Sequence, residues 1–244
     1  MPVNEYLKRS YRERVRSGGL ITFEVVVKET DLQVSAEKPL EREATNLVLE
    51  ARHQIETYIA LHPEFVATLV PYPEDPFAPA LVRDMIDCTG RLGVGPMASV
   101  AGAIAQHVGR GLLRDTSQVI VENGGDIFIA VRRPATIAVF AGPSPLSERV
   151  GIRIHPETTP LGICTSSASV GHSYSSGIAD AGCVLASSAT FADGAATALC
   201  NAIKSPKALS DVGAWAERTG GILGALVILG DRLATWGKIE LVAI

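Results

Sequence analysis

The stretch ADGAATAL, residues 192–199, lies inside a predicted helix over residues 191–203 and carries the strongest chemical signal in this chain of 244 residues. Asp193 and Thr197 are four residues apart, so in a helix the carboxylate and the hydroxyl lie on one face and can meet at one point. Two hard oxygen donors suit Mg²⁺, which takes few protein ligands beside waters and substrate phosphates. The structural alternative is that Asp193 caps the helix N-terminus and Thr197 bonds to its own helix.

Upstream, in VIVENGGD, residues 119–126, an apolar strand runs directly into a turn. Gly124 and Gly125 permit positive φ and a close backbone approach, so the turn can present N–H groups to a ligand. Asn-Gly is equally the commonest hairpin turn, and the apolar run continues beyond the glycines. Asn123 and Asp126 therefore flank either a ligand-binding turn or an ordinary hairpin.

Hydroxyl-bearing residues and glycines crowd a third segment, GICTSSASVGHSYSSG, residues 162–177. Such a segment can wrap a phosphate with backbone amides and hydroxyls, or it is an ordinary flexible loop. His172 is the only histidine inside a candidate site, where it is either a catalyst or a structural hydrogen-bonding group. Its GHSYS stretch lacks the last glycine of the α/β-hydrolase nucleophile elbow, and no histidine follows Ser173, so that class is excluded.

A fourth segment, GVGPMA at residues 93–98, fits the loose G-x-G-x-x-A dinucleotide pattern. The residues before it, 84–91, are too polar for the buried strand that this pattern requires. A proline in the first turn instead predicts the start of a helix over residues 96–113, whose N-terminus can face an anion.

Hydrophobic periodicity predicts the other elements and the fold class. We expect helices over residues 40–60 and 80–92. Strands are expected in a hairpin over 20–36 with its turn at 28–31, in runs over 118–122, 127–131 and 136–140, over 183–186, and in a hairpin over 224–244 that closes at Gly230-Asp231. Strands at both ends with helices between them indicate an α+β fold of layered sheets and helices. We expect one domain over residues 1–244, or two subdomains that share a core.

Composition and charge exclude some classes of binding partner and indicate where in the cell the protein acts. The net charge of −4 and the scattered basic residues argue against a nucleic-acid partner. The charged N-terminus lacks the apolar stretch of a signal peptide, and no segment approaches about 20 apolar residues, so we expect no membrane association and a cytoplasmic protein. No CxxC pair occurs, so we expect free, mostly buried thiols at Cys88, Cys164, Cys183 and Cys200.

Taken in order, four of these segments resemble the ApbE family of FAD:protein FMN transferases. Members of that family carry a G-x-x-A-K-G helix start, an N-x-G-G-[DN] strand end, a G-I-[SA]-T-S-G segment and an A-D-A-x-A-T-A-L helix. This chain has GPMASV, NGGD, GICTSS and ADGAATAL in the same order, between residues 93 and 199. The resemblance implies an ApbE-like α+β fold with layered mixed or antiparallel sheets and helices.

The resemblance also implies a chemistry and the residues that carry it. Mg²⁺ is expected on the Asp193 carboxylate, the Thr197 hydroxyl and the Ala98 carbonyl, where it meets the pyrophosphate of FAD. In the family the FMN phosphate passes to a threonine hydroxyl of an acceptor protein while AMP leaves. With His172, Asp193 and Thr197 are the candidate catalytic residues. The candidate flavin-contacting residues are Gly95, Ala98, Ser99, Asn123, Gly124, Gly125, Asp126, Cys164, Thr165 and Ser166.

The chain departs from the family pattern at two points. Ser99 stands where the family has lysine, which removes a cation expected near the phosphates, and the family's H-x-x-D-P-x-T-G segment is reduced to residues 172–177. Three functions stay open: a Mg²⁺-dependent flavin transferase or FAD pyrophosphatase, a non-catalytic binder of flavin or another nucleotide, and an assembly protein with a vestigial site. The older family label, thiamine biosynthesis, has no mechanistic support in these residues.

Overall fold

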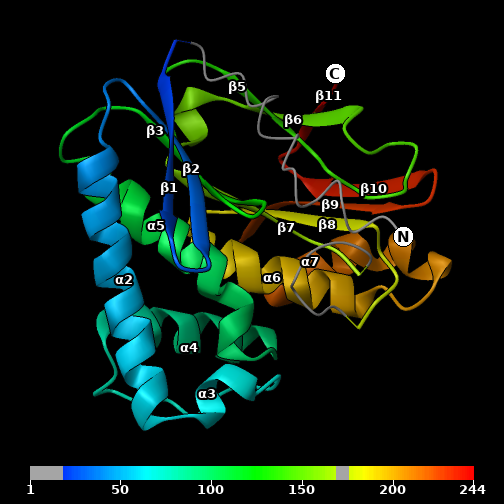
Figure 1. The fold of residues 1–244 in the computed structure, drawn as a ribbon. Coiled ribbons are helices and arrows are strands. Elements are labelled where there is room, and N and C mark those ends of the chain that lie inside the picture. Colours follow the sequence, from blue (N-terminus) through cyan, green and yellow to red (C-terminus); the bar gives the residue numbers. More distant parts are fainter. Residues whose placement is uncertain (1–18, 169–175) are drawn as a thin grey trace.

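The computed structural model describes residues 19–168 and 176–244, and these form three layers, as expected of an α+β fold (Figure 1). Helices cover one face of a large sheet, and a small sheet lies on its other face. All neighbouring strands are antiparallel. In spatial order the large sheet contains β1 (Ile21–Val27), β2 (Thr30–Ala36), β3 (Val119–Asn123), β4 (Asp126–Ala130), β7 (Leu161–Ser166), β8 (Ala181–Ala186), β9 (Ile222–Leu229) and β10 (Arg232–Gly237), and the small sheet contains β11 (Glu240–Ala243), β6 (Val150–Ile154) and β5 (Ala135–Ala138).

Helices occupy the long segments between strands. The α-helices of the described residues are α2 (Glu41–Leu61), α3 (Glu64–Ala67), α4 (Ala80–Leu92), α5 (Val100–Leu112), α6 (Ala189–Ala202) and α7 (Val212–Thr219). Short 3₁₀ helices are η2 (Pro96–Ser99), η3 (Pro156–Thr158) and η4 (Pro206–Asp211). The longest, α2, places Ala44, Val48, Ala51 and Ile55 on one buried face, which is the helical spacing seen in the sequence.

The large sheet separates two hydrophobic cores, one under the helices and one under the small sheet. Successive side chains of a strand point to opposite faces, so Val119 and Val121 of β3 join the core under the helices, while Ile120 joins the core under the small sheet. Strand β4 is buried along its whole length. A strand covered on both faces needs an unbroken apolar run, and this explains the apolar character of both strands.

Most of the expected elements are present. The hairpin of β1 and β2 turns at Lys28 and Glu29, helix α4 has the expected bounds, and β9 and β10 close at Gly230 and Asp231. The helix expected over residues 96–113 begins as the 3₁₀ turn η2, which leads into α5. Residues 240–243 leave the C-terminal hairpin to form β11 in the small sheet, so the expectation of a single hairpin over 224–244 was incomplete.

The segment interpreted as a phosphate-wrapping or flexible loop begins as a central strand. Residues 161–166 form β7 between β4 and β8, with Leu161 and Ile163 buried. Gly162 made the segment hard to identify as a strand, because glycine is depleted in strands although Leu161 and Ile163 keep the alternating apolar pattern. Strand β6 and helix α7 were also not anticipated.

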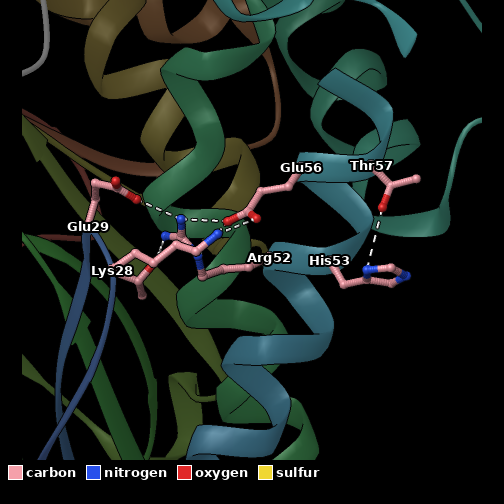
Figure 2. Close-up of polar contacts among 7 residues, drawn as sticks. Lys28, Glu29, Arg52, His53, Glu56 and Thr57 are labelled. Carbon is pink, nitrogen blue, oxygen red and sulfur yellow. Dashed lines mark hydrogen bonds and ion pairs between the residues drawn. The ribbon is translucent and has the colours of Figure 1, made fainter. Parts of the chain in front are cut away.

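Polar contacts fix the hairpin of β1 and β2 to helix α2 (Figure 2). The Arg52 guanidinium reaches Glu29 at 2.6 Å, Glu56 at 2.6 Å and the Thr30 hydroxyl at 2.7 Å. Lys28 adds an ion pair with Glu56 at 2.7 Å. Only 14% of the Arg52 side chain is exposed, so its contacts are less screened by solvent than those of Lys28, which is 60% exposed.

The four cysteines are free and buried, as expected. Within residues 19–168 and 176–244, no helix has the length and apolar character needed to cross a membrane.

Candidate functional site

Asp193 lies in helix α6 and caps the neighbouring helix α5. Its Oδ2 accepts a hydrogen bond of 2.8 Å from the backbone N–H of Gly102, and the amide of Ala101 also faces it. These amides belong to the first turn of α5, where N–H groups lack partners within the helix and the helix dipole favours negative charge. The cap of α6 itself is Ser188, which accepts from the Phe191 amide at 3.2 Å. Asp193 is therefore an N-terminal cap, but of a different helix.

Small residues allow these segments to meet. A Cβ on Gly102 would lie 2.3 Å from the carbonyl oxygen of Ala189 and 2.7 Å from Cβ of Asp193. A Cβ on Gly162 in β7 would lie 2.3 Å from Cα of Ala189. Neither distance leaves room for a methyl group. Gly102 of α5 and Gly162 of β7 thus let these two elements approach the first turn of α6 closely.

A buried polar network holds the start of α6 against α4 and α5. The Thr190 hydroxyl donates to Asp84 Oδ2 at 2.7 Å, and Gln106 Nε2 donates to Thr190 at 3.1 Å. Gln106 Oε1 accepts from the Ala189 amide at 2.8 Å. Because each of these groups has a partner, the network orients the first turn of α6, which precedes Asp193 directly.

Asp126 begins β4 on the helix-facing side of the sheet. Only 7% of the residue is exposed, and its Oδ1 has no hydrogen-bond partner within the described residues. Burial raises the pKa of Asp126 well above its usual range, and the negative charge of Asp193 raises it further. Burial also raises the pKa of Asp193 to about 7, against the stabilising amides of Gly102 and Ala101. Two buried carboxyl groups therefore interact at this point.

The turn from Asn123 to Gly125 was expected to be either a hairpin or part of a ligand site, and its geometry is compatible with both. It is a tight hairpin between β3 and β4, with φ of 65° at Gly124 and 105° at Gly125. It also lies against the start of α5, since Asn123 Nδ2 donates to the Ala101 carbonyl at 3.1 Å. Glu122 Oε1 accepts from the Gly125 amide at 2.8 Å. The turn is thus a hairpin positioned beside Asp193.

Strand β7 presents alternate residues to this region. Cys164 faces α6, where its thiol donates to the Ala189 carbonyl at 3.4 Å. Burial raises the pKa of Cys164 well above its usual range, and the charges of Asp126 and Asp193 add to that effect. Thr165 pairs with Cys183, which belongs to the core under the small sheet, so its side chain points to the opposite face. Ser166 returns to the helix side, buried, and its hydroxyl has no partner within the described residues.

The turn from Gly95 to Ser99 packs against both α3 and α6. A Cβ on Gly95 would lie 2.0 Å from the Thr68 carbonyl oxygen, so only glycine fits there. Ser99 is fully buried, and its hydroxyl donates to the Pro96 carbonyl at 2.9 Å. Ala98 is half-buried in the same turn. Ser99 therefore satisfies its hydroxyl within its own turn.

Thr197 is 6% exposed and lies one turn after Asp193 in α6. His172 falls outside the described residues. The structure thus brings together four of the predicted site residues, Asn123, Asp126, Cys164 and Asp193. The turn over residues 95–99 lies beside α6. The Thr165 side chain points away, to the opposite face of the sheet. The amides of Ala101 and Gly102 were missed by sequence reasoning, although a glycine inside a helix is a signal for close approach.

The donors of this region suit a hard divalent cation. No group of three His, Cys, Asp or Glu side chains with metal-binding geometry occurs in residues 19–168 and 176–244, so a closed zinc site has no basis there. A site for Mg²⁺ needs only one or two carboxylates beside neutral oxygens and phosphates. The unpartnered oxygen of Asp126 and the buried carboxyl of Asp193 fit that requirement.

Solved structures with the same fold include ApbE proteins. A flavin transferase ApbE from Vibrio cholerae superposes with a TM-score of 0.61 at 16% identity, over 89% of this chain and 96% of that one. The ApbE protein of Thermotoga maritima superposes with a TM-score of 0.57 at 15% identity, over 88% and 96%. At these identities the likeness establishes the fold.

Sequence comparisons establish the family. A UPF0280 protein of Methanocella arvoryzae is 37% identical over 219 residues, which cover 89% of either chain. Another, of Methanosphaerula palustris, is 40% identical over 215 residues, covering 87% of this chain and 89% of its own. The family model described as AbpE bacteria matches residues 12–231. The chain therefore belongs to this divergent ApbE-like family, which the order of its four motifs had predicted.

Proposed function

We propose that this protein binds FAD with Mg²⁺ and cleaves its pyrophosphate, either transferring FMN to an acceptor protein or releasing FMN and AMP into water. The observation that carries the proposal is the convergence of Asp193, the Asn123 turn and β7 at the amino end of α5. Proteins with this fold are named flavin transferases, which supports flavin as the ligand class. We further propose that it acts in the cytoplasm.

The proposed Mg²⁺ ligands are the Asp193 carboxylate, the Thr197 hydroxyl and the Ala98 carbonyl. When bound, Mg²⁺ supplies positive charge that stabilises a cleaving pyrophosphate. The protein's own part is to hold Asp193 in place, through the amides of α5 and the network that orients the start of α6. A carboxylate has about four lone-pair positions, so the amide bonds leave some for a cation.

The reaction breaks the bond between one phosphorus of FAD and the bridging oxygen. A hydroxyl oxygen of the acceptor, or of water, forms the new bond to the FMN phosphorus, AMP leaves with the bridging oxygen, and the hydroxyl proton is released. His172 stays the proposed catalytic histidine. The backbone of the Asn123 turn and the positive end of the α5 helix dipole position the phosphates, since a helix N-terminus favours anions.

One observation favours a second candidate, a non-catalytic flavin binder. Ser99 is fully buried and its hydroxyl is occupied by Pro96, so this position offers neither a cation nor a free donor to a phosphate. One lost cationic contact to a developing charge costs on the order of a hundredfold in rate. A protein with this site can therefore bind FAD and leave it intact.

Calorimetric titration tests the ligand class. FAD, FMN, ADP and ATP are each titrated with and without Mg²⁺. We expect FAD to bind and to bind more tightly with Mg²⁺. Binding of none of them, or of ATP alone, contradicts the flavin assignment.

Chromatography separates the enzyme from the binder. With FAD and Mg²⁺, we expect AMP and FMN to rise together over hours, and Ser99→Lys to accelerate their release. Ser99→Met is the matched control, because it has a similar length without the charge. If FAD binds and stays intact for a day in the wild type and in Ser99→Lys, the binder is the better description.

A further inference from the structure

We propose that Asp126 is a second carboxylate ligand of the divalent cation at Asp193, an inference that rests on the proposed function. Asp126 is the first residue of β4 and pairs with Cys164 of β7 across the sheet. Phe128 and Ala130 share its face and belong to the core under the helices. Its side chain therefore lies on the same side of the sheet as α6 and Asp193.

The surroundings of Asp126 leave one of its oxygens unused. The residue is 93% buried, and Oδ1 has no hydrogen-bond partner within the described residues. A buried carboxylate oxygen without a partner is strongly unfavourable, because it has lost water and gained nothing. Such an oxygen is explained when an ion completes its environment.

The other acidic groups around α6 differ from Asp126 in this respect. Asp193 accepts the amide of Gly102, and Asp84 accepts the hydroxyl of Thr190 and the amide of Gln106. No salt bridge to Asp126 or Asp193 occurs in residues 19–168 and 176–244. Lysine and arginine therefore do not balance these two charges in the described part of the chain.

The two carboxylates are close enough to repel each other. Among charged groups, Asp193 has the largest electrostatic effect on Asp126. Two like charges in a dry environment destabilise the folded state, and a cation between them reverses the sign of that interaction. Oxygen donors of this type select hard divalent ions, Mg²⁺ or Mn²⁺, over zinc or copper.

The test compares Asp126→Asn with Asp180→Asn, a matched removal of an acid whose carboxylate already accepts the Gly230 amide at 2.7 Å. Thermal unfolding is measured in EDTA, MgCl₂ and MnCl₂, and Mn²⁺ affinity by electron paramagnetic resonance. We expect Asp126→Asn to melt about 2–4 °C above the wild type in EDTA, because a neutral amide removes the cost of burying a carboxylate that has no cation beside it. We expect it to lose at least about tenfold in Mn²⁺ affinity. Asp180→Asn should melt below the wild type, because its hydrogen bond to the Gly230 amide is weakened, and keep its Mn²⁺ affinity.

Three results would overturn the inference. The first is Mn²⁺ affinity in Asp126→Asn equal to that of the wild type, while Asp193→Asn loses it; the proposed cation site then survives without Asp126. The second is an equal loss of affinity in Asp180→Asn, which would indicate a general folding effect. The third is failure of both Asp126→Asn and Asp126→Ser to fold, since a ligand carboxylate should not be needed for folding. If the wild type binds neither Mg²⁺ nor Mn²⁺, the proposed function fails as well.

Discussion

The contrast between Asp193 and Thr197 gives the sharpest prediction for single residues. Asp193→Ala removes the only charge among the three proposed family-type ligands, so we expect it to abolish the effect of Mg²⁺ on FAD binding, with a loss of at least about tenfold. Thr197→Ala removes a neutral hydroxyl and should cost less. Titration calorimetry with and without Mg²⁺ measures both. A larger loss at Thr197 than at Asp193 would contradict the argument from charge.

At the contact between α5 and α6, adding one methyl group should change the stability of the protein. Gly102→Ala should destabilise the protein by about 1–3 kcal/mol, because the new Cβ meets the Ala189 carbonyl at 2.3 Å. Gly90→Ala is the control: it lies exposed in α4 with nothing within 4 Å of a new Cβ. There the higher helix propensity of alanine should stabilise by up to about 1 kcal/mol. Urea unfolding measures both, and equal effects would show that α5 and α6 are not in close contact.

The junction between β2 and the loop before β3 should be sensitive to acid. Glu37 accepts hydrogen bonds from Gln118, from the amide and hydroxyl of Ser117 and from Thr116, which lower its pKa to about 2. A lowered pKa in the folded state contributes stability above the unfolded value of 4.5, and this contribution is lost as the pH falls toward 2. Glu37→Gln should therefore show a shallower loss of stability over this range. Urea unfolding at several pH values would reveal equal slopes if the interaction is unimportant.

For the whole molecule, we expect the free energy of unfolding to depend on pH when no divalent cation is present. Burial raises the pKa of Asp193 to about 7 from 3.8, so between these values the folded state holds a proton that the unfolded chain has released. Stability in EDTA should therefore fall as the pH rises from about 4 to 7. Mg²⁺ competes with the proton, so its stabilising effect should be larger at pH 8 than at pH 5. Scanning calorimetry of the wild type and Asp193→Asn tests this: the slope should be shallower in the variant, where the raised pKa of Asp126 still contributes, and an unchanged slope would assign the effect elsewhere.

The sequence by itself determined the fold class, most helices and the two main hairpins. The reason is that α2 and α4 carry regular apolar faces, and the turns at Lys28 and Gly230 interrupt strand-type runs. Motif order also predicted the family, since four short patterns in register are far more specific than any one of them. These signals depend on residues that are close together in the sequence, so they can be recognised without the tertiary structure.

Only the tertiary structure decided the partners of the candidate site residues. Spacing placed Asp193 and Thr197 on one helix face, yet it could not reveal that the Asp193 carboxylate would cap α5, which is about 90 residues away in the chain. Nor could it show that β7 is a central strand, with Cys164 toward the helices and Thr165 turned away. Burial and electrostatic coupling depend on which distant segments pack together. Whether Asp126 and Asp193 are solvated or dry is therefore a property of the assembled layers and not of either motif.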